Sequence, residues 1–387
     1  MNKFSIGLMF SLTLLLGGVL LLEPNVYTCC GTSANQESLE KDVALLFLGE
    51  VAQVDLNAYN ISLKWSVIPS IITSYFYPGH TQTSVIVSLV SLVNGTGSFE
   101  AKVDFLDGEL LSCNIYGKSP GKLALKRHFT NTVDLVKFIL QQYSVNFNAS
   151  YCNKLGILLN AIKQINSVQE IDANYAVLTV RPSVAGGVGF GWRFKMNNVL
   201  SVKKEFGMGI ADQNDESYLD LFSDAWRHYS IGNSAVNVSR EEAISTALTI
   251  LDADADEMTF SDVKKETLKI IQKQISEEGA KIVNRDAILL FDNSRSGDCL
   301  TLDAAWKVTF YYDKAYSYGI DKIIVRVWTD TGQIFDLTTG GGYSGDSDIP
   351  ATVDSSSPPI YWLAAAALSL SIPTTALIIH KKNKHHK

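Results

Sequence analysis

Two uncharged apolar segments, one near each end of the chain, constrain its structure most strongly. The first covers residues 4–22, follows Lys3 and precedes a stretch of small residues at 31–34. A basic start, an apolar run and a small-residue ending are typical of a secretory signal peptide. We therefore expect a signal peptide at residues 1–34 that is removed, and because the apolar run is long enough to span a membrane, its retention as an anchor is the alternative.

The second segment, residues 360–379, contains no charged residue. At a rise of about 1.5 Å per residue, a helix of this length crosses the hydrocarbon core of a bilayer, which is roughly 30 Å thick. Tyr361 and Trp362 lie where interfacial aromatic residues are common, and a Lys- and His-rich tail follows. The pattern predicts a transmembrane helix at residues 359–380 in contact with membrane lipid. We expect a single-pass protein of the cell membrane, with its body extracytoplasmic and its basic tail, residues 381–387, cytoplasmic.

The body between these ends is acidic. Residues 35–357 contain 28 Lys and Arg against 39 Asp and Glu, a net charge of −11. Binding to a phosphate backbone requires a basic face, so this charge argues against nucleic acid as a partner. Hydrophobic residues make up 46% of the chain and charged residues 19%, which is too apolar for a disordered protein.

The first half of the body has the pattern of an antiparallel meander. Runs rich in β-branched residues at 84–93 and 98–105 are separated by Asn94-Gly-Thr-Gly97, a strong hairpin signal, and a third run at 110–116 follows Asp107-Gly108. The other expected elements of this half are helices at residues 38–50, 133–143 and 151–165, and strands at residues 175–181, 191–196 and 218–222.

The second half repeats this order of elements. A helix at 239–251 begins with a capping box formed by Ser239 and Glu242. It is followed by an expected helix at residues 261–276 and by expected strands at residues 305–312, 323–329 and 333–337. Trp192 and Trp306 hold equivalent places in the two halves, which indicates a diverged duplication.

We therefore expect an α+β fold of two related units, each with helices on an antiparallel sheet, plus the C-terminal transmembrane helix. The units cover residues 35–235 and 236–345, and a flexible stalk follows at residues 346–358.

Trp306, Val308 and Phe310 share one face of their strand at period two. The face is expected to pack against the helix at 239–251, so Trp306 is predicted to be structural. The same interpretation, core rather than ligand cage, applies to Trp192, Trp226 and Trp328.

Three stretches of the second unit resemble the PepSY domain. They are Val238-Ser-Arg-Glu-Glu-Ala-Ile-Ser-Thr-Ala-Leu248, Ala305-Trp-Lys-Val-Thr-Phe310 and Ile324-Val-Arg-Val-Trp-Thr-Asp-Thr-Gly-Gln-Ile334. The resemblance covers residues 238–338. It implies a PepSY/cystatin-like unit that contacts a peptidase or another envelope component, often as an inhibitor. The whole layout also resembles uncharacterised membrane-anchored surface proteins of archaea, which implies a location and no activity.

Two kinds of modification are predicted from short patterns. Four sequons mark candidate N-glycosylation sites at Asn60, Asn94, Asn148 and Asn237. Two of the five cysteines lie at positions 29 and 30, in the expected signal segment, which leaves Cys113, Cys152 and Cys299. An odd number allows at most one bridge within the chain, and we expect the possible disulfide to join Cys113 and Cys152.

Candidate catalytic, cofactor and metal motifs are each better explained as structure. Asp252-Ala-Asp-Ala-Asp256 begins like a calcium loop, but Glu257 replaces the required Gly and Val263 replaces the bidentate Glu. The glycine-containing segments 117–122 and 185–191 lack the spacing of nucleotide-binding loops and are predicted to be turns. Other candidates without a recognisable ligand or catalytic spacing are Asp212, Asp215, Glu216, Asp220, Asp224, His80, His128 and His228. We therefore assign no catalytic, cofactor-binding or metal-binding residue.

Three functions remain. The favoured hypothesis is a membrane-anchored, extracytoplasmic, non-catalytic binding or regulatory protein, with a peptidase or another surface protein as partner. The alternative is a surface-structural or adhesion protein. A hydrolase with a site scattered through the acidic half is the least favoured, and it would require perturbed carboxylates or His128 or His228 to converge in one cleft.

Overall fold

The computed structural model describes residues 33–341, apart from residues 71–72, 74–76, 95, 184–185, 214–215 and 293–297. The expected stalk, transmembrane helix and tail lie outside the described residues, as does all but the end of the expected signal peptide. Among the helices that are described, none combines the length and the apolar character that a membrane span requires.

The expected α+β fold of two related helix-on-antiparallel-sheet units is wrong. The structure is mostly β, with 41% strand and 27% helix, and its main sheet is mixed and has 13 strands. The sheet is mixed because β8 (Val199–Gln213) and β11 (Ile282–Phe291) run parallel, with Leu290 opposite Leu200 and Phe291 opposite Ser201. A parallel pair needs a long connection, so local sequence patterns do not reveal it.

The chain divides into two compact units whose boundaries differ from the expected division near residue 235. Within the described residues, unit 1 comprises positions up to Asn148 together with Asp212–Phe222. Unit 2 comprises Ala149–Ala211 and the residues from Ser223 onward. The stretch that resembles PepSY is therefore only part of unit 2.

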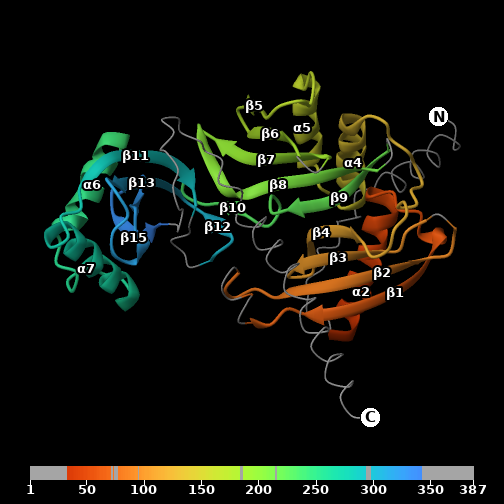
Figure 1. Cartoon of the computed structure of the whole chain (residues 1–387), viewed down its shortest axis with the longest axis horizontal. Coiled ribbons are helices and arrows are strands. Elements are labelled where there is room, and N and C mark those ends of the chain that lie inside the picture. Colours follow the sequence, from red (N-terminus) through yellow and green to blue (C-terminus); the bar gives the residue numbers. More distant parts are fainter. Residues whose placement is uncertain are drawn as a thin grey trace, which may run out of the picture. The chain divides into compact units, whose positions relative to one another are not determined.

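Unit 1 is built on a β-meander (Figure 1). Its strand order is β1 (Tyr59–Val67), β2 (Gln82–Ser91), β3 (Phe99–Leu106), β4 (Glu109–Gly117) and then β9 (Glu216–Asp224). The pairs from β1 to β4 are antiparallel, as the hairpin signals predict. The helical elements of unit 1 are α2 (Ser33–Leu46), which continues into a π-helical turn (Phe47–Val51), a short 3-10 turn (Leu56–Ala58) and α4 (Thr132–Asn146).

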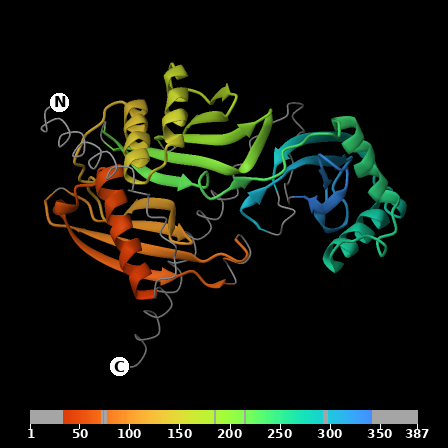
Figure 2. The ribbon, with the colours of Figure 1, turned by 180° about the vertical axis from the view of Figure 1, so that it is seen from behind.

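The core of unit 1 lies between this sheet and its helices. Figure 2 shows α2 lying across one face of the β1–β4 strands. Phe47 at the end of α2 contacts Tyr143 of α4 and Phe222 of β9, at ring-centroid distances of 6.4 and 4.8 Å. All three side chains are fully buried, so they join α2, α4 and β9 in one aromatic cluster.

Unit 2 contains two strand series that meet at β8. The first is an antiparallel ladder of β5 (Gln169–Ala173), β6 (Ala176–Pro182), β7 (Val188–Met196) and β8. The second continues from β11 through β13 (Ala304–Tyr312) and β14 (Lys322–Trp328) to β15 (Ile334–Gly340), with antiparallel pairs. A separate two-stranded parallel sheet joins β10 (Ser230–Ile231) and β12 (Thr301–Leu302). The helical elements are α5 (Tyr151–Leu158), α6 (Arg240–Thr249), α7 (Asp262–Ser276) and 3-10 turns at Leu159–Ala161, Ile250–Asp252 and Ser317–Gly319.

Helices α6 and α7 lie beside the β11–β15 series, as Figure 1 shows. The capping box of α6 is confirmed, because the Ser239 side chain accepts from the backbone N–H of Glu242 while the Glu242 carboxylate accepts from the N–H of Ser239. The buried residues Ala243, Ile244 and Ala247 of α6 share one apolar cluster with Trp306, Val308 and Phe310 of β13. The local helix-on-sheet prediction therefore holds here, although the fold class does not.

The four tryptophans predicted to be structural are all buried, with exposed fractions between 0 and 8%. The indole N–H of Trp192 donates to the carbonyl oxygen of Leu155 at 3.2 Å, and that of Trp306 donates to the carbonyl oxygen of Val238 at 2.8 Å. A buried indole with a satisfied N–H is a core residue. The prediction of core positions is confirmed.

Candidate functional site

A hollow of about 460 Å³ lies at the start of α4 in unit 1. We call it the α4 hollow. Its lining comes from the loop before the helix and from the exposed side of the first three turns, and consists of Arg127, His128, Phe129, Thr130, Asn131, Asp134, Lys137, Phe138 and Gln141.

The loop before α4 is held in place from two directions. Asn131 caps the helix, because its side-chain oxygen accepts from the backbone N–H groups of Val133 and Asp134 at 2.9 and 3.2 Å. The backbone N–H of Ser217 on β9 donates to the carbonyl oxygen of Phe129 at 3.1 Å. The α4 hollow is therefore built on a fixed loop between a helix and a strand of unit 1.

Two phenyl rings form the apolar wall of the α4 hollow and hold a guanidinium group. The rings of Phe129 and Phe138 lie 5.3 Å apart, and Arg127 Cζ lies 4.9 Å from the centroid of each ring. Such cation–π contacts are worth about 0.5–1 kcal/mol each at an exposed site. They orient the guanidinium without using its N–H donors.

The polar side of the α4 hollow carries charges of both signs. His128 Nδ1 lies 3.1 Å from Glu216 Oε2, which ties this histidine to β9. Within the described residues, neither Arg127 nor Lys137 forms a hydrogen bond or an ion pair through its side chain. Two cationic groups without acidic partners among the described residues therefore line the same hollow. The arrangement suits the binding of a polar, negatively charged ligand and contains no evident nucleophile.

The other sequence candidates are dispersed over the two units. Asp212, at the end of β8, accepts from Ser217 Oγ at 2.7 Å, and Asp220 lies on β9; both belong to unit 1. Asp224 belongs to unit 2, and Asp215 lies outside the described residues. His228 lies in the turn at 226–228 of unit 2. The described acidic candidates are therefore divided between the two units.

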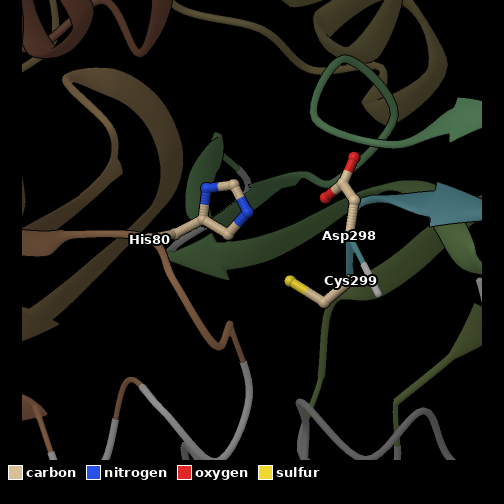
Figure 3. Close-up of side chains that lie close together, drawn as sticks. All are labelled: His80, Asp298 and Cys299. Atoms are coloured by element: carbon tan, nitrogen blue, oxygen red, sulfur yellow. The ribbon is translucent and has the colours of Figure 1, made fainter. Parts of the chain in front are cut away.

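His80 belongs to unit 1, where its Nδ1 lies 2.6 Å from Asp107 Oδ2. Figure 3 draws His80 together with Asp298 and Cys299, which belong to unit 2. In that unit Asp298 accepts from the backbone N–H of Leu300 at 3.0 Å and from Thr301 Oγ1 at 2.8 Å, so its carboxylate orders the turn before β12. His80 and Asp298 thus each have a local structural role in their own unit.

The calcium-like segment is a turn, as the sequence predicts. The Asp254 carboxylate accepts from the backbone N–H of Asp256 at 2.9 Å. Asp256 pairs with Lys269 Nζ at 2.9 Å, and the hydrogen bond from that ammonium lowers the pKa of Asp256. The Asp254 carboxylate therefore stabilises the turn, and the Asp256 carboxylate connects the turn to α7.

The modification candidates have clear positions. Asn60, Asn94, Asn148 and Asn237 are all exposed, as an attached glycan requires. The expected disulfide is not present, because Cys113 on β4 and Cys152 on α5 are both free, buried thiols. Burial raises the pKa of both thiols, so neither is a reactive thiolate at neutral pH.

Sequence reasoning missed a buried amine in unit 2. Lys204 Nζ on β8 donates to the carbonyl oxygens of Trp226 and Tyr229 and lies 5.6 Å from the centroid of the Phe194 ring. Burial lowers its pKa to about 8, and the Asp224 carboxylate opposes this shift. Because two backbone carbonyls accept from the amine, we interpret Lys204 as a tether that holds the turn after β9 on β8.

A second perturbed group on β8 gives a prediction for pH. Glu205 lies opposite Arg193 of β7. Burial raises the pKa of Glu205 from 4.5 to about 7, and the Arg193 charge lowers it in part. Between pH 4.5 and 7 the folded state therefore retains a proton that the unfolded state has lost. We expect the free energy of unfolding to fall as pH rises through this window, by at most about 1.4 kcal/mol per pH unit.

Urea denaturation of the full chain at several pH values measures this slope. Glu205→Gln is expected to flatten it. Glu170→Gln is the matched control, because Glu170 contacts the same arginine at 3.4 Å but its side chain is 51% exposed. An unchanged slope in Glu205→Gln would show that Glu205 is not the group responsible.

No family model matches the chain, and no curated protein matches it. The resemblance of residues 238–338 to the PepSY domain therefore stays a prediction. The α4 hollow lies at residues 127–141, outside that stretch.

Proposed function

We propose that this chain is a non-catalytic binding protein of the extracytoplasmic surface, held there by the apolar segment at residues 359–380, and that the α4 hollow is its ligand site. The observation that supports the site is a hollow of about 460 Å³ lined by two cationic side chains that have no acidic partner among the described residues. Arg127 on the loop and Lys137 on α4 are available to a ligand without first breaking an internal ion pair.

The location and the site are tested together by a cysteine at position 141. Gln141 is exposed and lines the α4 hollow. In a full chain whose Cys29, Cys30 and Cys299 are replaced by Ser, Gln141→Cys is treated on intact cells with a membrane-impermeant maleimide that carries a photo-crosslinker. Val263→Cys, on α7, is the matched control because Val263 is 77% exposed and lies far from this loop in the sequence.

We expect both cysteines to be labelled from outside, and illumination to give a discrete adduct from position 141 alone. Labelling that requires permeabilised cells would contradict the extracytoplasmic location. Identical adducts from both positions, or none from position 141, would contradict the α4 hollow as the site. An adduct of two copies of this chain would instead favour the surface-structural alternative.

A further inference from the structure

We propose that the α4 hollow binds a carboxylate, specifically an acidic side chain of a peptide segment, and that Arg127 is the group that recognises it. This inference rests on the proposed function of the hollow and adds the chemistry of the ligand. It follows from the orientation of one guanidinium, from the use of the helix-terminal amides, and from the charges that line the cavity.

Arg127 is ordered while its hydrogen-bonding groups stay available. Its guanidinium lies 4.9 Å from the centroids of both Phe129 and Phe138, so its position is set by contacts with two rings. Its five N–H donors have no acceptor among the described residues. A planar guanidinium presents paired donors that match the two oxygens of a carboxylate, and stacking on aromatic rings reduces the entropy lost on binding.

The amino terminus of α4 does not compete for this role. The Asn131 side chain already accepts from the N–H groups of Val133 and Asp134. At many helix amino termini, free backbone N–H groups bind anions, but two of those groups on α4 already donate to Asn131. Recognition of a negative group in the α4 hollow depends on Arg127 and on Lys137, which also has no ion pair within the described range.

The charges around the α4 hollow favour a monoanion over a phosphate dianion. Arg127 and Lys137 contribute two positive charges, and the lining residue Asp134 contributes one negative charge. Glu216 adds a carboxylate at the rim, where it pairs with His128 at 3.1 Å. With His128 neutral these four charges cancel, and with His128 protonated they leave one positive charge. A second negative charge on the ligand would meet Asp134 and Glu216 at a cost.

The size and the wall of the cavity favour a side chain on a peptide over a small free anion. A volume of about 460 Å³ is much larger than a carboxylate group and lies in the usual range for ligand pockets. Phe129 and Phe138 supply an apolar surface beside the cation. The methylene groups of a glutamate side chain can pack on these rings while its carboxylate reaches Arg127.

Fluorescence anisotropy of a labelled hexaglutamate peptide, titrated with the full chain, tests the inference. Hexaglutamine of the same length is the comparison without carboxylates, and both peptides carry the label at the N-terminus and an amide at the C-terminus. We expect the glutamate peptide to bind at least about tenfold more tightly, because hydrogen bonds between two charged groups are roughly twice as strong as those between neutral groups. Arg127→Gln should remove that preference, and Arg127→Lys should restore part of it because the charge returns without the planar fork.

Lys126→Gln is the matched control. Lys126 precedes Arg127 in the sequence but pairs with Glu50 at 2.9 Å and does not line the α4 hollow. We expect this variant to bind the glutamate peptide within about twofold of the unmodified chain, because rim charges contribute little. Binding should also weaken as sodium chloride rises from about 0.05 to 0.5 M, since salt screens charges at an exposed site.

Four outcomes would overturn the inference. They are equal binding of the two peptides, failure of both peptides to bind, unchanged glutamate binding in Arg127→Gln, and displacement of the glutamate peptide by inorganic phosphate at lower concentration than by acetate. In every case a persisting site-specific adduct from position 141 would leave the proposed binding function intact. Failure of the carboxylate inference can therefore be distinguished from failure of the proposed function.

Discussion

Replacing Trp306 with Ala is expected to lower the free energy of unfolding of the full chain by about 3–5 kcal/mol. Trp306 is 8% exposed and lies in the apolar cluster between α6 and β13. The substitution removes a large ring from that cluster and leaves the carbonyl oxygen of Val238 without its donor at 2.8 Å. A typical domain is stable by about 5–15 kcal/mol. Unit 2 of the variant is therefore expected to unfold at a clearly lower urea concentration than unit 2 of the unmodified chain.

Circular dichroism during urea denaturation measures this effect. Tyr311→Ala is the matched control, because Tyr311 lies on the same strand and is 38% exposed. We expect it to change the free energy of unfolding by less than about 1 kcal/mol. If Trp306→Ala unfolded at the same urea concentration as the unmodified chain, Trp306 would not be a core residue.

Glu40→Ala is expected to destabilise unit 1 by about 2–5 kcal/mol. Glu40 is fully buried on α2, and its carboxylate accepts from Trp65 Nε1 at 2.6 Å and from Thr83 Oγ1 at 2.6 Å. It therefore links α2 to β1 and β2. The truncation leaves the buried hydroxyl of Thr83 and the half-buried indole N–H of Trp65 without their acceptor, and an orphaned buried group costs about 1–3 kcal/mol.

Glu37→Ala separates this effect from a general loss of helix charge. Glu37 lies one turn earlier on α2 and pairs with Lys41 at 2.6 Å, with its side chain 40% exposed. An exposed pair of this kind contributes about 0.3–0.5 kcal/mol. Equal urea midpoints for Glu40→Ala and Glu37→Ala would contradict the role of Glu40 as the link between α2 and the sheet.

Local signals predicted most individual elements. The Asn94–Gly97 segment separates β2 from β3, and the capping box at Ser239 begins α6. Period-two and helical patterns placed β13 and α7 within one or two residues of their observed ends. These elements were predictable because turn chemistry, capping and burial of one face all act over a few residues.

Long-range pairing was not predictable. Neither β8 nor β11 was expected as a strand, because Lys203, Lys204 and Glu205 interrupt the apolar pattern of β8 and because β11 contains charged residues before its apolar end. Their parallel contact makes the sheet mixed and overturns the expected fold. A charged residue is tolerated there when its strand gives it a partner, as β7 does for Glu205 through Arg193.

The α4 hollow was missed for a related reason. His128 was considered only as a catalytic candidate, yet its partner Glu216 lies 88 positions away in the sequence. Arg127 contacts the ring of Phe138, which lies 11 positions later and on α4, so the contact depends on how the loop enters the helix. The available signal was a run of three basic residues, 126–128, directly before a helix capped by Asn131 in an otherwise acidic body.

The most direct test of the account is the ¹⁵N resonance of the Arg127 guanidinium, Nε–H, in the full chain, identified by its absence from Arg127→Gln. We predict that this resonance shifts on addition of hexaglutamate and stays in place on addition of hexaglutamine, because only the first peptide offers a carboxylate acceptor. A resonance that responds to both peptides or to neither, while the glutamate peptide binds, would contradict recognition of the ligand by Arg127.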